Sequence, residues 1–308
     1  MSTRRTACSA AALTLGLTLA VQPFAASPTV AAPTDSVLST FAMGNLDVVQ
    51  VKAGPGVANK YLITTTGLWF VLFKDASNVP FATSDDDCYL GVLASPTCAF
   101  TTYPNMHINV QAGDMNDSVT VAAQPEFDAL LNGGPGNDTL RSTGKGYSYF
   151  YGGDGADTVT FEGLSIPVRA TIDGNFDDGP TGSEPGYINA DVENLTGGSA
   201  NDVLRGGPAV LGMLKGGPGA DTMYAGPAGS ALFGGTGNDT LVGGAGVDFL
   251  AGEAGADTLY GGAGDDHIYV DDGAPGDTIT CGAGNDTVTL DAGDTLRDPQ
   301  SCERVFMD

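Results

Sequence analysis

The chain has 308 residues, of which 46 are glycine, and its 37 acidic and 12 basic side chains give a net charge of −25. Because nucleic-acid binding depends on Lys and Arg meeting phosphate, this charge excludes nucleic acid as a natural partner. A surface of this kind attracts cations, and it resists compaction unless cations neutralise it. Composition alone also fits an acidic disordered chain, so the choice between a folded and a disordered protein depends on the order of the residues.

The first residues have the pattern of a secretory signal peptide, which we expect over residues 1–32. Arg4 and Arg5 form a basic start, an apolar stretch runs from Ala10 to Ala26, and small residues follow up to Ala32. A membrane anchor is the alternative, but the apolar run is shorter than the roughly 20 residues that span a bilayer. We therefore expect a secreted, extracellular protein without a membrane span.

Residues 33–106 lack any repeat and form an N-terminal β-rich region. Runs of apolar, β-branched and aromatic residues occur at 46–51, 61–66 and 68–73, separated by turn-forming residues, which is the pattern of short strands. This region is either a small β domain or a cap on the rest of the chain.

Nine-residue repeats come next and are the clearest feature of the chain. Six of them run without a gap from Gly216 to Tyr269, beginning with GGPGADTMY, and two more follow a two-residue insertion at 270–271. The consensus is GGxGxD followed by three residues, with an aliphatic residue at position eight. Regular repeats occupy 197–289 and degenerate ones 107–160, while 161–196 has the composition of an inserted acidic loop and 290–308 that of a C-terminal cap.

Each position of the repeat has a physical reason. Glycine at positions one, two and four permits backbone angles that a Cβ forbids and lets the backbone approach an ion closely. Aspartate at position six supplies a hard carboxylate oxygen, which suits calcium. The last three residues form a strand whose middle side chain points inward. The expected inward residues are Met223, Leu232, Leu241, Leu250, Leu259, Ile268, Ile279 and Val288.

Two repeats together complete one coil of about 18 residues, so stacked coils bury a thin continuous core. The sequence therefore predicts an all-β fold, a right-handed parallel β-solenoid or β-roll. A cap at the N-terminal end is expected because an open solenoid end exposes sheet edges.

The GGxGxD repeats resemble the RTX β-roll repeats of secreted bacterial calcium-binding proteins. In that family, calcium ions lie between successive turns and are held by the position-six carboxylates and by turn carbonyls. The resemblance implies several Ca²⁺ ions here. The ligands that it implies are Asp138, Asp157, Asp202, Asp221, Asp239, Asp248, Asp257, Asp266, Asp277 and Asp286, with Asp117 as a weaker match because its turn lacks two of the glycines.

A single aspartate in a turn is more simply explained as a turn former, but the same slot filled repeatedly favours calcium. Magnesium fits less well because it keeps its waters and requires stricter octahedral geometry. An additional calcium ion is expected in the acidic stretch that contains Asp177, Asp178 and Glu184.

The register of the repeats places turns of the same edge two repeats apart. One edge is then expected to stack Asp202, Asp221, Asp239, Asp257 and Asp277, and the other Asp248, Asp266 and Asp286. Ser230 interrupts the second edge, so we expect about four ions on the first edge and about two on the second.

Four cysteines follow the expected signal peptide, and an even number in an exported chain suggests disulfides. Three pairings are possible. Pairing Cys88 with Cys98 and Cys281 with Cys302 is favoured because the members of each pair are close in sequence.

No catalytic residues are predicted. The two histidines, His107 and His267, belong to no HExxH motif, and no G-x-S-x-G motif is present. We expect a non-enzymatic calcium-binding protein with a structural, adhesive or interaction role, whose partner is an extracellular polysaccharide or a cell-envelope surface. The alternatives are a calcium-dependent carbohydrate-active enzyme, such as a lyase or epimerase, and a glycan-binding module that uses outward residues such as Tyr260.

Overall fold

The structure is a computed structural model. It describes residues 106–307 except 123–127, 144–145, 184, 209–211 and 271, together with the backbone of seven strands between residues 37 and 99. The expected signal peptide lies outside the described residues.

The described part of the chain folds into three β-sheets, which we call A, B and C. Sheet A has seven strands, in the spatial order β16 (Tyr187–Ile188), β12 (Ser148–Asp154), β10 (Asp128–Pro135), β8 (Met106–Gln111), β2 (Leu46–Lys52), β1 (Val37–Met43) and β5 (Ala82–Thr83).

Sheet B has 14 strands, in the order β29 (Arg304–Met307), β27 (Thr287–Leu290), β25 (His267–Val270), β23 (Phe249–Ala254), β21 (Ser230–Thr236), β19 (Gly212–Pro218), β17 (Asn194–Thr196), β13 (Thr158–Thr160), β11 (Thr139–Ser142), β9 (Ser118–Ala122), β3 (Lys60–Thr65), β4 (Phe70–Asp75), β7 (Pro96–Ala99) and β6 (Cys88–Leu90). Sheet C has eight strands, in the order β15 (Gly179–Pro180), β14 (Val168–Thr171), β18 (Val203–Arg205), β20 (Thr222–Tyr224), β22 (Thr240–Val242), β24 (Thr258–Ala263), β26 (Thr278–Ala283) and β28 (Thr295–Leu296).

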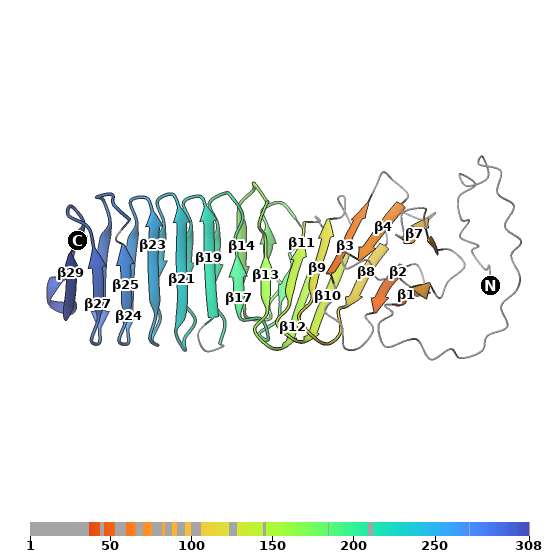
Figure 1. The fold of residues 1–308 in the computed structure, drawn as a ribbon, viewed down its shortest axis with the longest axis horizontal. Helices are drawn as coiled ribbons and strands as arrows, with labels where there is room; N and C mark the ends of the chain where they lie inside the picture. The colour runs from red at the N-terminus through yellow and green to blue at the C-terminus, as the bar shows by residue number, and fades with distance from the viewer. Residues whose placement is uncertain are drawn as a thin grey trace, which may run out of the picture.

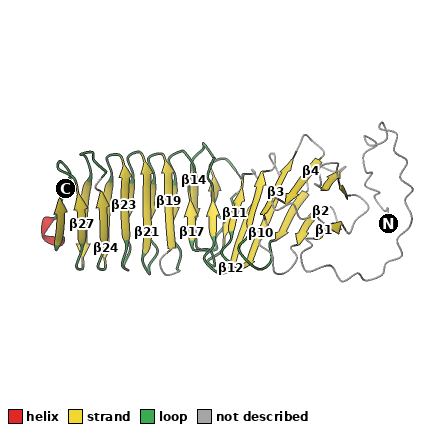
Figure 2. Cartoon of the chain, viewed as in Figure 1, coloured by secondary structure: helices red, strands yellow, loops and turns green. Residues whose placement is uncertain are grey.

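The molecule is an elongated β-solenoid of about ten turns. Its strands lie side by side across the long axis, and successive coils follow one another from β8 to β29 at the C-terminal end (Figure 1). The connecting turns gather along the two long edges (Figure 2). Among the described residues the one helix is a 3-10 turn at Pro299–Ser301, and no described helix is long and apolar enough to cross a membrane.

The coil length agrees with two repeats per coil. Leu232 of β21 pairs in parallel with Leu250 of β23, which lies 18 residues later. Leu259 of β24 pairs with Ile279 of β26, 20 residues later, so the two-residue insertion leaves the register of the sheets intact. The predicted parallel register is therefore confirmed.

In the regular repeats the core consists of two rows of inward side chains, one from sheet B and one from the facing sheet C. All eight residues that the sequence predicted to point inward, from Met223 to Val288, are at most 2% exposed. Near the middle of the rod the core also contains two aromatic rings, those of Phe150 and Phe161, which meet edge to face at 6.3 Å. Because each coil buries so little apolar surface, packing of this kind has to be shared between neighbours.

The face of the solenoid opposite sheet B passes from sheet A to sheet C within residues 161–196. In this range the sequence suggested an inserted acidic loop. This range holds four short strands, β14 to β17. β16 is the last strand of sheet A, and β14 pairs with β18 in sheet C. Asp178 joins the two sheets, because its Oδ1 accepts the N–H of Thr171 and its Oδ2 accepts the N–H of Ile188.

The N-terminal strands extend the solenoid sheets. β2 pairs in parallel with β8, and β3 pairs in parallel with β9, whereas the β1–β2 and β3–β4 pairs are antiparallel. At the other end a disulfide joins Cys281 to Cys302, as predicted. Strands β6 and β7 place Cys88 opposite Cys98 in register, but the expected bridge between their side chains lies outside the described features.

Candidate metal sites

The position-six side chains form two columns, one along each long edge of the solenoid. The edge 1 column lies where the chain passes from sheet B to sheet C, and the edge 2 column lies where it enters sheet B. Edge 1 holds Asp202, Asp221, Asp239, Asp257 and Asp277. Edge 2 holds Asp117, Asp138, Asp157 and Glu193, then Ser230, Asp248, Asp266, Asp286 and Glu303.

A ladder of hydrogen bonds fixes each column. In edge 1 the backbone N–H of Asp221 donates to Oδ1 of Asp239 at 2.7 Å, and the N–H of Asp239 donates to Oδ1 of Asp257 at 2.7 Å. In edge 2 the N–H of Asp248 donates to Oδ1 of Asp266 at 2.8 Å. From Asp138 and Asp202 onward, each position-six carboxylate is thus held by the preceding coil. Every aspartate that the sequence predicted as a ligand stands in one of the two columns.

Most of these carboxylates keep their second oxygen without a hydrogen-bond partner. We call such turns open. Their unpartnered, buried Oδ2 atoms belong to Asp138, Asp157, Asp221, Asp239, Asp257, Asp266, Asp277 and Asp286. All eight residues are at most 2% exposed. A buried oxygen of an ionised carboxylate without a partner is costly, so each open turn requires either a proton or a cation.

Three turns are closed instead. Oδ2 of Asp202 accepts the N–H of Gly198 at 2.6 Å, and Oδ2 of Asp248 accepts the N–H of Gly244 at 2.6 Å. Oγ of Ser230 accepts the N–H of Gly226 at 2.9 Å in the same way. The side chain of a closed turn is satisfied by its own backbone. Ser230 departs from the aspartate of the consensus, whereas Asp202 and Asp248 match it at position six.

The glycines of an open turn have two different roles. Those at positions two and four, such as Gly235 and Gly237, have φ of +114° and +129°, which other residues rarely adopt. Gly234 at position one has an ordinary φ but no room for a side chain. A Cβ there would lie 2.5 Å from Oδ2 of Asp239 and 2.4 Å from the carbonyl oxygen of Gly252 in the next coil. The side of the position-one glycine that lacks a Cβ thus borders a small space lined by oxygen atoms. The expectation that position one needs special backbone angles is therefore wrong, since this glycine is required for space.

The electrostatic state of the columns follows from their burial. Burial, opposed in part by the ladder hydrogen bonds, raises the pKa of Asp221 and Asp257 from 3.8 to about 7. The same causes raise the pKa of Asp138, Asp266 and Asp277 to about 6. Carboxylates in adjacent coils add repulsion, as Asp202 and Asp239 do at Asp221. A divalent cation between coils would offset both costs.

The composition of the donor set indicates which cation fits. No group of three or more His, Cys, Asp or Glu side chains that could hold a metal occurs among the described residues. A cation in the columns must therefore take backbone carbonyls as well as carboxylates. An all-oxygen set of this kind suits a hard cation with many ligands and flexible geometry, which describes calcium.

Sequence reasoning missed two members of edge 2. Oε2 of Glu193 accepts the N–H of Asp157 at 2.7 Å, and Oε2 of Glu303 accepts the N–H of Asp286 at 2.8 Å. Neither glutamate lies in a GGxGxD turn, and the longer side chain reaches the same slot from a different backbone path. A carboxylate directly before a strand of sheet B was the one signal available.

The acidic stretch expected to hold an additional ion is arranged differently. Both oxygens of Asp178 accept backbone N–H groups, and burial raises its pKa to about 7. Asp173 accepts the backbone and side-chain N–H groups of Asn175. Glu184 lies outside the described residues. Asp178 therefore has a structural role as a link between sheets, and the additional ion stays a prediction.

The fold and the columns together define an all-β parallel β-solenoid with stacked aspartates along its edges. A family model described as RTX calcium-binding nonapeptide repeat (4 copies) matches residues 128–142, 132–163, 187–208, 230–258, 242–275 and 276–295. The chain thus carries RTX calcium-binding nonapeptide repeats, and these repeats with their aspartate columns imply calcium binding. No curated protein matches the chain.

Proposed function

We propose that the protein is a secreted, non-enzymatic exoprotein that calcium folds into a rigid rod, with a structural, adhesive or interaction role outside the cell. The observation that carries this proposal is the row of buried, unpartnered Oδ2 atoms in the open turns. When calcium is bound, it supplies positive charge between the coils. The chain's own residues supply the oxygen ligands, the space beside the position-one glycines and the ladder that aligns successive coils.

Secretion is supported by two features. The repeats are of a type found in secreted bacterial proteins. The disulfide between Cys281 and Cys302 persists in oxidising surroundings, such as those outside the cell. Extracellular calcium modules commonly bind with dissociation constants of about 10⁻⁴–10⁻³ M, so export would itself bring the chain to the ion that folds it.

The open and closed turns make the proposal testable at single residues. Asp239 is in an open turn and Asp248 is in a closed turn, while both are ladder members at most 2% exposed. Asp239→Asn is expected to lower the number of calcium ions bound per chain by one or two, because it removes a charged ligand. Asp248→Asn should leave that number unchanged, since the Oδ2 of Asp248 is already taken by Gly244.

Equilibrium dialysis with metal analysis of the folded proteins measures the number directly, and a thermal melt in saturating calcium confirms that both variants fold. An equal loss of ions in the two variants would remove the distinction between open and closed turns. Full calcium content in Asp239→Asn would contradict the role proposed for the edge 1 column.

A further inference from the structure

A cluster of aromatic rings covers the outer face of sheet A, on the side away from the core. Tyr149 and Tyr151 lie at alternate positions of β12, and Tyr147 continues the alternation just before the strand, while Phe150 is buried. Tyr187 on the neighbouring strand β16 and Phe176 from the loop between β14 and β15 complete the cluster. We call these five residues the tyrosine face. The aspartate columns lie on the solenoid edges and use none of them.

The rings form an extended shallow surface. Tyr149 and Tyr187 lie 6.4 Å apart at 37°, Tyr151 and Tyr187 5.5 Å apart at 38°, and Phe176 and Tyr187 5.1 Å apart at 43°. Tyr147 continues the row 6.4 Å from Tyr149 at 33°. One pair, Tyr149 with Phe176, is edge to face at 79°. Apart from that pair, neighbouring rings are tilted by 33° to 43° and follow one another across the face, which makes a platform. A cage around a single ammonium group needs rings that surround one point.

The platform is accessible to solvent and has polar neighbours. Phe176 is 58% exposed and Tyr147 is 36% exposed. The register of sheet A sets Asn132 of β10 beside Tyr151, with Gln111 of β8 next in the same row. The amides of these side chains can donate and accept hydrogen bonds. A surface of ring faces beside amides is suited to a ligand that presents apolar C–H groups on one side and hydroxyls around its rim.

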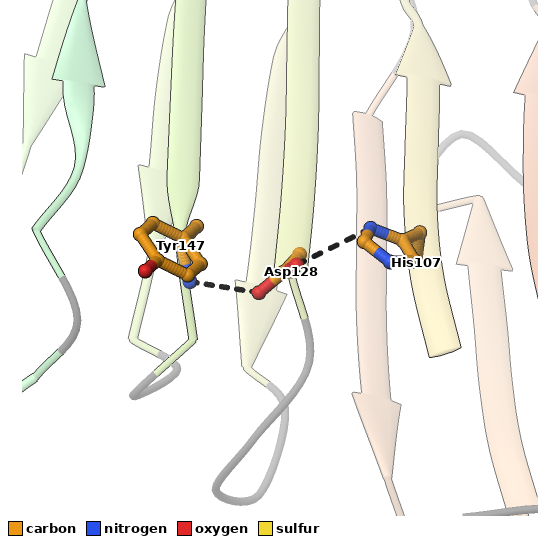
Figure 3. A network of polar contacts seen from close by, with 3 residues as sticks. All are labelled: His107, Asp128 and Tyr147. Atoms are coloured by element: carbon orange, nitrogen blue, oxygen red, sulfur yellow. Dashed lines mark hydrogen bonds and ion pairs between the residues drawn. The ribbon is translucent and has the colours of Figure 1, made fainter. Parts of the chain in front are cut away.

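The charge around the platform narrows the class of ligand. Asp128 of β10 accepts the backbone N–H of Tyr147 at 2.9 Å and pairs with Nδ1 of His107 at 3.3 Å (Figure 3). Burial and then the charge of Asp128 raise the pKa of Tyr149, so the field at the ring is negative. A polyanion would meet this field and the net charge of −25, and both would repel it.

We propose that the tyrosine face binds an uncharged polysaccharide. Its sugar rings would stack on the aromatic rings, and its hydroxyls would donate to the carboxylate of Asp128 and hydrogen-bond with the amides of Asn132 and Gln111. From Tyr147 to Tyr151 the outward positions of one extended strand span roughly 13 Å, a length that suits several linked sugars. This activity goes beyond calcium binding, which serves here to keep the coils in register beneath the platform.

Affinity electrophoresis of the full-length protein in saturating calcium tests the proposal. Native gels would contain hydroxyethylcellulose or galactomannan as uncharged polymers, polygalacturonate as the anionic polymer and chitosan as the cationic one. The uncharged gels should retard the wild-type protein, and the Tyr149→Ala/Tyr187→Ala double variant should bind at least tenfold more weakly. The matched controls are Phe249→Ala and Tyr269→Ala, whose side chains are 40% and 44% exposed on sheet B, and these should bind like the wild type.

Circular dichroism of each variant with calcium separates this proposal from the calcium-driven fold, because a variant that folds normally but fails to bind reports on the tyrosine face alone. Absence of retardation in both uncharged gels would overturn the proposal. So would retardation by chitosan only, which the net charge of −25 would explain without any site, and so would equal weakening in the control variants.

Discussion

Excess chelator is expected to unfold the repeats between Asp202 and Asp286 in the purified protein, and added calcium is expected to refold them. Without cations, the open turns hold buried carboxylates whose Oδ2 atoms have no hydrogen-bond partner. Each of these carboxylates is also repelled by the negative carboxylates of the neighbouring coils. An ion at ten times its dissociation constant stabilises the folded state by about 1.4 kcal/mol. About six independent sites would contribute roughly 8 kcal/mol, which lies within the usual stability of a whole domain.

Far-ultraviolet circular dichroism during a calcium titration measures this transition, and analytical ultracentrifugation shows the change from an expanded chain to a compact rod. Magnesium at the same concentration is the control, and it should produce less folding because it prefers to keep its waters. An unchanged spectrum across the titration, together with no bound metal, would refute the calcium-driven fold.

The second large effect is an inverted dependence of stability on pH in the absence of calcium. Burial raises the pKa of Asp221 and Asp257 from 3.8 to about 7, and that of Asp138, Asp266 and Asp277 to about 6. A carboxyl whose pKa is higher in the folded state stabilises the fold while it is protonated. That contribution is complete below the unfolded value near 4 and is lost as the pH rises through the folded value near 6 to 7.

Calcium-free protein is therefore expected to be more folded at pH 4 than at pH 7.5, the reverse of ordinary acid denaturation. In saturating calcium the order should be opposite, because only ionised carboxylates bind the ion. Thermal melts at the two pH values, each with chelator and with calcium, give the four melting temperatures that this comparison requires. Greater stability of the calcium-free protein at pH 7.5 would show that the columns are not the groups that destabilise it.

Much of the fold could be predicted because the repeat constrains it strongly. The period of nine residues defined both edges, and the ladder confirms that Asp202 to Asp277 form one column and Asp248 to Asp286 another. The burial of Leu232 and its equivalents followed from the alternation of a three-residue strand. In the regular repeats the turn residues, the nine-residue period and the inward side chains all favour the same fold, so few alternative structures were open to this part of the chain.

The rest depended on contacts between coils, which no single repeat contains. The closed turns at Asp202 and Asp248 have the same position-six residue as open ones, so that residue does not distinguish the two kinds of turn. Glu193 and Glu303 reach the edge 2 column from outside the consensus. The tyrosine face joins β12 to residues more than 20 positions further along the chain, and no periodic pattern marks that encounter.

The interruption at Ser230 has a mechanical consequence. Because a solenoid connects each coil mainly to its immediate neighbours, a pull along the long axis loads the intervals between coils in series, and the weakest one sets the force at which the rod parts. On edge 2, Ser230 offers a hydroxyl, already occupied by Gly226, where Asp248, Asp266 and Asp286 of the following coils offer a carboxylate. If the protein anchors a cell or a matrix, tension would open the rod first beside this coil, while the segments on either side stay wound.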